Sequence, residues 1–227
     1  MNLATLQLGV RDLGLLPYAK ALALQQQVHQ EVLARRKAAT VLFCEHDPVI
    51  TVTARRGAER HICADSVRLA RLGIDLQPTD RGGDVTYHGP GQIVAYPILR
   101  LAELGLNVSR YMRLLEQVVM QTLGVFEISG QRVAGETGVW VGDGGAGCPA
   151  EAGAKICAMG IRVRKNVTMH GLALNVRTRL EHFQTIIPCG LPGCRVTSMS
   201  RLLGDRCPSM QQVKDELLGQ MRSLLVP

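Results

Sequence analysis

The stretch Lys155–Leu174, KICAMGIRVRKNVTMHGLAL, contains two runs of mostly apolar residues separated by Arg164-Lys165-Asn166. Runs of this kind, bounded by a short polar segment, are typical of two strands joined by a tight turn. We therefore expect strands over Lys155–Val163 and Val167–Leu174, paired as a β-hairpin. The predicted fold thus contains an antiparallel sheet.

Outward from the hairpin, the chain shows many short strand patterns and few helices. Helices are expected over Leu15–Lys37, Asp65–Leu72, Val108–Leu123 and a C-terminal segment that opens with the capping box Ser209-x-x-Gln212; strands are expected over Thr40–Cys44, Val49–Thr53, Ile74–Gln77, Ile93–Leu99, Val125–Ile128 and Val139–Val141. Asp65 and either Asn107 or Ser109 are the expected N-caps, with Gly73 and Gly124 closing their helices. Runs of strands with few helices and no regular alternation predict an α+β fold, with mixed or antiparallel sheets flanked by helices.

The length and composition favour one compact unit in a reducing compartment. With 227 residues, 46% of them hydrophobic, we expect a single domain over residues 1–227. No secretory leader and no membrane-length apolar run are present, so we expect a cytoplasmic protein without a membrane partner. Seven cysteines, an odd number, then argue against a disulfide framework.

The net charge of +7 favours an acidic partner through long-range attraction. Nucleic acid is not expected to be that partner, because the basic residues are scattered and only 4% of the residues are aromatic. No cysteine and histidine spacing matches a zinc site, so no metal is expected. The glycines at 142, 144 and 147 spell G-x-G-x-x-G, but Cys148-Pro149 follows where a dinucleotide-binding turn would open a helix. We expect a hairpin tip there.

Two loops and one lysine stand out as candidates for chemistry. Arg81–Gln92, RGGDVTYHGPGQ, combines glycines that let a ligand approach the backbone with polar side chains, although a pair of tight turns would need the same glycines. Ile186–Cys194, IIPCGLPGC, is compatible with a metal ligand, a disulfide or a nucleophile. Lys155 opens an apolar strand, and from the residues alone the favoured interpretation is a lysine that extends to solvent at the strand edge.

Five motifs in the same order, RGGDVTYHGPGQ, KICAMG, HGLALNV, PCGL and VTSM, together resemble the lipoyl(octanoyl) transferase family. The resemblance covers nearly the whole chain. It implies the catalytic fold shared with biotin and lipoate protein ligases. It also implies transfer of an octanoyl group from octanoyl-acyl carrier protein to a lysine of lipoyl domains, without ATP or any other cofactor. The implied acceptors are the lipoyl domains of 2-oxo acid dehydrogenase complexes and the glycine cleavage H protein.

Residue roles follow from the resemblance. Cys189 matches the cysteine that carries the acyl group as a thioester, and Lys155 matches the lysine that activates it. The resemblance assigns the substrate pocket to Arg81, Gly82, Gly83, Asp84, Val85, Thr86, Tyr87, His88, Ala158, Met159, Gly160, Gly171, Leu172 and Ala173. Met159 and Leu172 are candidate walls for the chain. His170 is a further candidate for ordering the polar end, and a purely structural role is equally compatible with it.

The chemistry agrees with these roles. A free cysteine thiol has a pKa near ~8.5, so a neighbouring base or cation is needed to form thiolate at neutral pH. Period two along the strand places Cys157 on the same face as Lys155, which suggests that Cys157 and Cys189 form an oxidation-sensitive pair. Two rival functions remain open at this point. One is an ATP-dependent lipoate or octanoate ligase of the same fold, and the other is a noncatalytic binding module with a basic surface.

Overall fold

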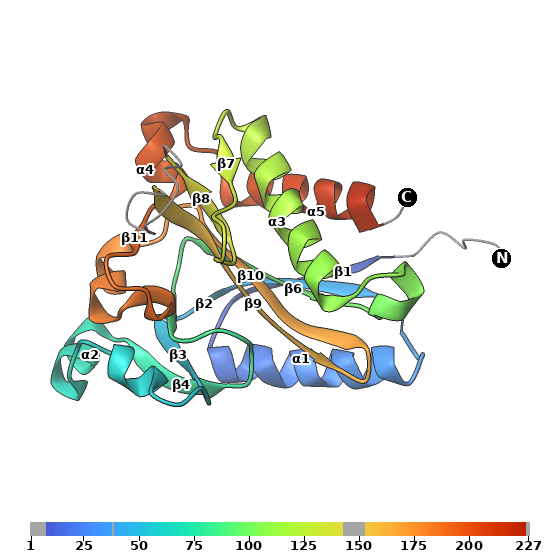
Figure 1. The fold of residues 1–227 in the computed structure, drawn as a ribbon, viewed down its shortest axis with the longest axis horizontal. Helices are drawn as coiled ribbons and strands as arrows, with labels where there is room; N and C mark the ends of the chain where they lie inside the picture. Colours follow the sequence, from blue (N-terminus) through green and yellow to red (C-terminus); the bar gives the residue numbers. More distant parts are fainter. Residues whose placement is uncertain (1–7, 38, 143–152, 226–227) are drawn as a thin grey trace.

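The computed structural model describes residues 8–37, 39–142 and 153–225. Its main sheet, within these residues, is mixed: β1 and β2 pair in parallel, as do β9 and β11, and the other neighbours are antiparallel. Figure 1 shows this sheet running through the middle of the molecule. Its strands, in spatial order, are β1 (Gly9–Leu16), β2 (Thr40–His46), β6 (Gln92–Ile98), β10 (Val167–Asn175), β9 (Ala154–Arg164), β8 (Val139–Val141) and β7 (Gly130–Gln131), with β11 (Arg195–Val196) beside β9.

The predicted hairpin is confirmed, and it forms the long centre of the main sheet. β9 and β10 pair from Val167 with Arg164 to Leu174 with Cys157. The turn residues Lys165 and Asn166 have φ of 49° and 66°, the left-handed conformation that a two-residue hairpin turn requires at both positions. The hairpin thereby brings Lys155, at one end of β9, into a sheet that also holds His170.

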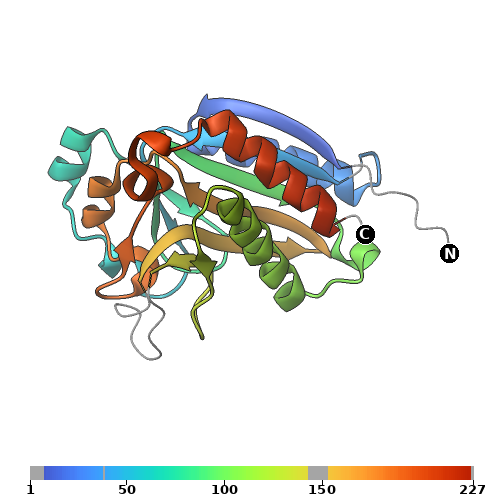
Figure 2. The same cartoon turned by 90° about the horizontal axis from the view of Figure 1, so that it is seen from above.

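Helices cover both faces of the main sheet (Figure 2). On one face α1 (Tyr18–Leu33) contacts β2, β6 and β10, with Ala21, Val28 and Val32 in the shared core. On the other face lie α3 (Val108–Val125) and α5 (Met210–Leu225), which pack on each other and on the sheet through a larger apolar cluster. The α+β architecture with helix-flanked mixed sheets is therefore as expected. No helix in the described part of the chain has the length and apolar character needed to cross a membrane.

A smaller sheet lies beside the main one and supports the loop of interest. It has the order β4 (Asp75–Thr79), β3 (Val49–Thr53), β5 (Thr86–His88), with α2 (Ser66–Leu72) packed against it. The segment between β4 and β5 reaches the main sheet, where Gly82 N donates to Ile161 O of β9 at 2.9 Å. A β-carbon at Gly160 would lie 2.6 Å from Gly82 O, so this approach of loop to strand requires glycine. The remaining short helices are η1 (Ala58–His61), η2 (Leu101–Leu104), η3 (Leu180–Thr185), η4 (Pro188–Gly190), α4 (Met199–Leu203) and η5 (Gly204–Arg206).

The N-terminal capping signals and the closing role of Gly73 are confirmed. Asp65 accepts a hydrogen bond from Arg68 N, and Asn107 accepts one from Arg110 N, so Asn107 and not Ser109 caps α3. Gly73 adopts the left-handed conformation after α2. Ser209 and Gln212 bond reciprocally at the start of α5, as a capping box does.

Three expectations for the elements are wrong. Leu15 and Leu16 belong to β1, whose parallel pairing with β2 was not predicted, and the first helix starts at Tyr18. Gly124 does not end α3, which continues through Val125, so there is no strand over Val125–Ile128. Solvent-exposed helical glycine costs only about 1 kcal/mol, and the packing of the rest of α3 outweighs it. The expected hairpin tip over the glycine-rich stretch falls mostly on residues 143–152, outside the described residues.

Candidate active site

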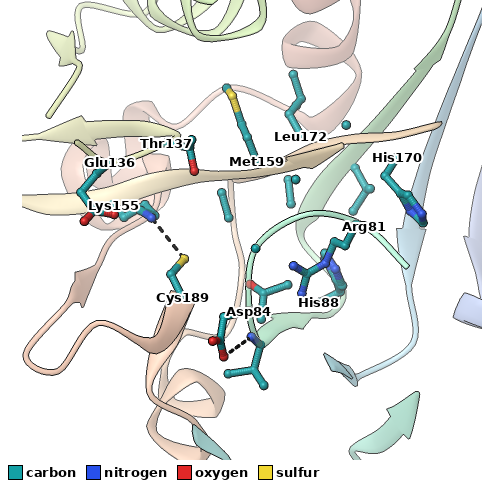
Figure 3. Close-up of a pocket in the computed structure, with 18 of the residues that line it drawn as sticks. Arg81, Asp84, His88, Glu136, Thr137, Lys155, Met159, His170, Leu172 and Cys189 are labelled. Atoms are coloured by element: carbon teal, nitrogen blue, oxygen red, sulfur yellow. Dashed lines mark hydrogen bonds between the residues drawn. The ribbon is translucent and has the colours of Figure 1, made fainter. Parts of the chain in front are cut away.

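A cavity of about 180 Å³ lies where the main sheet, the small sheet and the loop that carries Cys189 meet (Figure 3). Strand β9 and strand β10 form one wall, and the Arg81–His88 segment forms another. The Cys189 loop and the turn at Gly135–Thr137 also contribute. The hairpin and the RGGDVTYHGPGQ loop, which are far apart in the sequence, are thus brought together here.

Cys189 lies in the short helix η4 with an unusual backbone. Its φ is 60°, a conformation that non-glycine residues seldom adopt and that persists only when the surroundings hold it. Cys189 N donates to Val85 O at 3.2 Å, and Ile187 N donates to His61 O at 2.7 Å. The next residue, Gly190, has φ of 68°, and a β-carbon there would meet His61 and Asp84. These contacts fix the direction of the Cys189 side chain.

Lys155 faces Cys189 directly. Its Nζ donates to Cys189 Sγ at 3.1 Å, and it lies 4.7 Å from the centre of the Trp140 ring. Lys155 is only 4% exposed, so the interpretation from the residues alone, a lysine extending to solvent, is wrong. A cation over an indole face gains electrostatic attraction, which helps to offset the loss of water around the ammonium. Lys155 is therefore placed to exchange a proton with Cys189 or to hold its thiolate.

The Arg81 guanidinium spans the gap between the two sheets. Its Nη2 donates to the carbonyl and hydroxyl oxygens of Thr51, and its Nη1 donates to Gly82 O. Burial lowers the pKa of Arg81 from its usual value. Its Nε is buried and has no hydrogen-bond partner among the described residues.

Asp84 sits beneath the Cys189 loop with both carboxylate oxygens engaged. Oδ1 accepts hydrogen bonds from His61 Nδ1 at 2.7 Å and from Val85 N at 2.8 Å. Oδ2 lies 3.6 Å from Nη1 of Arg55, whose side chain is 67% exposed. Asp84 therefore supports the loop around Cys189, since Val85 is the residue whose carbonyl accepts from Cys189 N.

One end of the cavity is closed by buried aromatic and polar side chains. His88 is 6% exposed, donates from Nδ1 to Gln92 Oε1 at 2.7 Å, and lies parallel to the Tyr18 ring. Tyr96 bonds through its hydroxyl to His46 Nε2 at 2.7 Å. Burial lowers the pKa of His88 well below its usual range and that of His46 to about 4. The two rings are therefore neutral near pH 7.

His170 completes this closed end. It adopts φ of 57°, and its Nε2 lies 2.7 Å from Asp80 Oδ1. Burial first, then the charges of Arg81 and Arg162, lower its pKa to about 4, so a neutral ring donates Nε2–H to the carboxylate. Arg162 pairs with the other oxygen of Asp80. The Asp80 contact fixes the ring of His170 against the cavity wall.

Most of the sequence-predicted site residues meet at the cavity. The lining includes Arg81, Gly83, Asp84, Val85, Thr86, His88, Lys155, Ala158, Met159, Gly160, His170, Gly171, Leu172, Ala173 and Cys189. Gly82 and Tyr87 are not brought to it. Gly82 instead contacts β9, and the Tyr87 hydroxyl bonds to His182 Nδ1 in the core of the small sheet.

The expectation that Met159 and Leu172 wall the cavity with their side chains needs correction. They border the cavity, but their side chains rise on the opposite side of β9 from Arg81, His88 and Cys189 (Figure 3). There they pack against the large core under α3 and α5. Ala158 and Ala173, which are cross-strand partners, face the other way and line the cavity with small side chains.

Several lining residues were missed in the sequence. They are Tyr18, Arg55, Val94, Tyr96, Gly135, Glu136 and Thr137. Tyr18, Val94 and Tyr96 carried no signal beyond the apolar pattern of their elements. Glu136 lies in the tetrapeptide Gly-Glu-Thr-Gly, Gly135–Gly138, and an acidic residue framed by glycines before a strand could have drawn attention to this turn.

The premise of the Cys157–Cys189 pair is wrong. β9 pairs with β8 through Val139 with Cys157 and Trp140 with Lys155, so Ile156 is an extra residue and the alternation shifts there. Cys157 consequently faces the core with Ile156, is fully buried, and does not line the cavity. Cys194 borders a neighbouring groove, and burial raises its pKa to about 11, with Lys155 opposing and the charges of Cys189 and Glu136 adding to the rise.

No group of three or more histidine, cysteine, aspartate or glutamate side chains is arranged to hold a metal ion in the part of the chain that the structure describes.

Comparison with known proteins identifies the family. Residues 17–222 match the model of the lipoyl protein ligase A/B catalytic domain. The chain belongs to this family. Among its relatives, an octanoyltransferase of Pelobacter propionicus is 39% identical over 217 residues, 95% of this chain and 94% of the relative. An octanoyltransferase of Chloroflexus aurantiacus is 41% identical over 215 residues, 94% of this chain and 92% of the relative.

Solved structures show the same fold at low identity. A bipartite lipoate protein ligase from Thermoplasma acidophilum, described with its E2 lipoyl domain, superposes with a TM-score of 0.70 at 17% identity, covering 96% of this chain and 83% of its own. A biotin protein ligase from Aquifex aeolicus in complex with biotin and ATP gives a TM-score of 0.56 at 14% identity, covering 96% of this chain and 70% of its own. The fold shared by lipoate and biotin ligases, expected from the sequence motifs, is therefore confirmed.

Proposed function

We propose that this enzyme moves an octanoyl group from octanoyl-acyl carrier protein onto Cys189 and then onto a lysine of a lipoyl domain. Octanoyl transfer as such is the activity of the chain, because relatives of about 40% identity across nearly its whole length are octanoyltransferases. The contact of 3.1 Å between Lys155 Nζ and Cys189 Sγ, at the edge of the cavity, carries the proposal of a covalent route.

The first half-reaction starts with proton transfer from the Cys189 thiol to the neutral Lys155 amine. The thiolate then attacks the carbonyl carbon of the donor thioester, and the carbon–sulfur bond of the donor breaks. The leaving thiolate of the carrier takes the proton from the Lys155 ammonium. The products are the octanoyl thioester of Cys189, the free carrier thiol and a neutral Lys155, so this exchange of one thioester for another needs no ATP.

In the second half-reaction Lys155 again acts as the base, and Cys189 is now the sulfur from which the acyl group leaves. The ammonium of the acceptor lysine gives a proton to the neutral Lys155 amine, and the resulting free amine attacks the thioester of Cys189. The new carbon–nitrogen bond forms, the bond to Cys189 Sγ breaks, and the sulfur takes up the second amine proton. Lys155 releases its proton to solvent. An amide is more stable than a thioester, so the transfer proceeds towards the acylated lysine.

The closed end of the cavity is suited to the octanoyl chain. Val85, Val94, Ala158 and Ala173 supply apolar surface, and the tight backbone packing at Gly160 and Gly171 keeps side chains out of the way. We assign the pocket roles to the predicted residues that line the cavity, and supporting roles to Gly82 and Tyr87.

The proposed partners agree with the charge of the protein. A carrier with an acidic surface would be attracted by the net charge of +7, and the exposed Arg55 stands at the rim of the cavity. Lipoyl domains of 2-oxo acid dehydrogenase complexes and the glycine cleavage H protein are the proposed acceptors, in the cytoplasm. The Thermoplasma acidophilum neighbour, whose structure was described with an E2 lipoyl domain, supports this acceptor class.

The proposal is tested by intact mass spectrometry after incubation with octanoyl-acyl carrier protein in the absence of ATP and metal. We expect one octanoyl adduct that is lost in Cys189→Ala, forms at least ~100-fold more slowly in Lys155→Ala, and is discharged by an apo lipoyl domain. Cys63→Ala, which removes an exposed thiol from outside the cavity, is the matched control and should keep the adduct. Octanoylation from free octanoate and ATP, with no adduct, would establish a ligase instead.

A further inference from the structure

The cavity has two carboxylates among the described residues that line it, Asp84 and Glu136, and they differ in what they contact. Asp84 is 3% exposed, and its oxygens are occupied by His61, Val85 and Arg55. The carboxylate of Glu136 makes neither a hydrogen bond nor an ion pair with any part of the chain that the structure describes. Glu136 is therefore the lining carboxylate that remains available for a cationic group of a substrate.

Glu136 lies at the open end of the cavity. Its neighbours Gly135 and Thr137 are exposed, whereas Val94, Tyr96, His88 and His170 at the other end are all buried. Figure 3 shows the Lys155–Cys189 pair between Glu136 on one side and Arg81, His88 and His170 on the other. An acyl chain attached to Cys189 and extending into the closed end would leave the thioester carbon to be approached from the side of Glu136.

The turn that carries Glu136 is held in place by a buried carboxylate. Glu116 of α3, 1% exposed, accepts from Gly138 N at 3.3 Å, from Arg113 Nη1 at 2.8 Å and from Arg132 Nε at 2.9 Å. Gly138 packs so closely on β9 that a β-carbon would lie 2.4 Å from Cys157 O and 3.7 Å from Lys155 Cε. Glu136 N also donates to Val133 O. The position of Glu136 relative to Lys155 is thus fixed by the fold.

We infer that Glu136 binds the ammonium group of the acceptor lysine and orients it for attack on the octanoyl thioester of Cys189. The inference rests on the proposed function and adds the residue that recognises the acceptor. A lysine side chain in solution is charged at neutral pH, and a carboxylate is the group that pairs with it most strongly. Held by Glu136, the ammonium transfers one proton to the neutral Lys155 amine. The lone pair so exposed forms the carbon–nitrogen bond while the carbon–sulfur bond breaks, and Cys189 Sγ takes up the second proton of the attacking nitrogen.

The two half-reactions allow a direct test, because Glu136 acts only in the second. Octanoyl adducts of the wild type and of Glu136→Gln are prepared from octanoyl-acyl carrier protein, separated from the carrier, and mixed with increasing amounts of apo lipoyl domain. We expect adduct formation to agree within about twofold, whereas discharge at low acceptor concentration slows by about 10- to 100-fold in Glu136→Gln, as for loss of a charged hydrogen bond. Glu136→Asp should recover part of the rate.

A neutral nucleophile separates recognition of the acceptor from a general effect on the thioester. Hydroxylamine, uncharged at neutral pH, should discharge both adducts at the same rate. Glu127→Gln removes the same charge from a side chain that is 77% exposed and paired with Arg206, and it should behave as the wild type in every assay.

Three results would overturn the inference while leaving the proposed function intact. They are equal discharge by the lipoyl domain, equal slowing with hydroxylamine, and slower formation of the adduct in Glu136→Gln. Absence of any adduct in the wild type would overturn the proposed function, and the inference with it.

Discussion

The two ends of the cavity are built on opposite principles. At the closed end the polar side chains satisfy one another: Tyr18 bonds to Thr79, Tyr96 to His46, His88 to Gln92 and His170 to Asp80. At the open end Glu136 is unpaired within the described residues, and the Lys155–Cys189 pair keeps its reacting atoms directed at the cavity. Satisfied buried networks are rigid, whereas groups that exchange protons and acyl chains must remain available. We therefore assign recognition of the shape of the acyl chain to the closed end and the chemical steps to the open end.

The largest predicted effect is the loss of folding stability at low pH that arises from the buried histidines of the closed end. Burial lowers the pKa of His46 and of His170 to about 4, from a usual value of 6.5. Between these values the unfolded chain binds protons that the folded chain does not, so each ring makes a contribution to stability that is complete above pH 6.5 and is lost as the pH falls to about 4. The loss is on the order of 3 kcal/mol per ring.

Urea unfolding measured across this pH range checks the prediction. The free energy of unfolding should fall with acidity, and the slope should be smaller in His46→Gln, which removes one titrating ring. At the closed end His46 faces Cys44, Tyr96 and the ring of His88. The charge of the neighbouring Asp47 raises the pKa of His46, but by less than burial lowers it. A free energy of unfolding that stays constant through this pH range would show that the folded protein protonates these rings without losing stability. The closed end would then not be a rigid network.

The next effect concerns the side chains that limit the length of the acyl chain that the cavity can hold. Ala158 lies on the cavity face of β9 and Met159 on the core face. Substitutions at these two adjacent residues should therefore have very different effects on the preference for acyl-chain length. Ala158→Leu should lower kcat/KM for octanoyl donors by about 10- to 200-fold relative to butanoyl donors, as expected for a hydrophobic pocket that loses room for methylenes. Met159→Leu, which conserves volume, should leave the preference unchanged. Competition between octanoyl- and butanoyl-acyl carrier protein measures both, and an equal shift in the two variants would contradict the assignment of faces.

The sequence predicted those parts of the fold that local signals determine. The hairpin turn at Lys165-Asn166 and the caps at Asp65, Asn107 and Ser209 depend on residues a few positions apart, and all are confirmed. Strand β1 was missed because its partner β2 follows only after α1, and because its side chains are mostly exposed and show no alternation. Parallel pairing across a helix leaves no pattern within the strand itself.

For the site, the sequence motifs named residues that the fold brings together, but not the directions of their side chains. The extra residue at Ile156 arises from pairing with β8, and it sends Lys155 to the cavity and Cys157 to the core. Strict alternation of side chains along the strand predicted, wrongly, that Lys155 and Cys157 lie on one face. Glu136 was missed because its importance comes from Glu116, Arg113 and Arg132, which fix its turn from other parts of the chain.

The smallest effect concerns the spacing of β6 and β10, which form the wall of the closed end. A β-carbon at Gly171 would lie 2.2 Å from Ala95 O, a backbone atom that cannot rotate away, so Gly171→Ala should destabilise the protein by about 1–3 kcal/mol. Gly219→Ala is the matched control: this exposed glycine in α5 has no atom within 4 Å of the added carbon, and the change should stabilise the helix by up to about 1 kcal/mol. Urea unfolding midpoints distinguish the two signs. Gly171→Ala could instead keep both the wild-type stability and the rate of octanoyl adduct formation. The two strands would then be able to move apart without loss of stability. The selectivity of the closed end would in that case depend on side chains alone and not on the close approach of the two backbones.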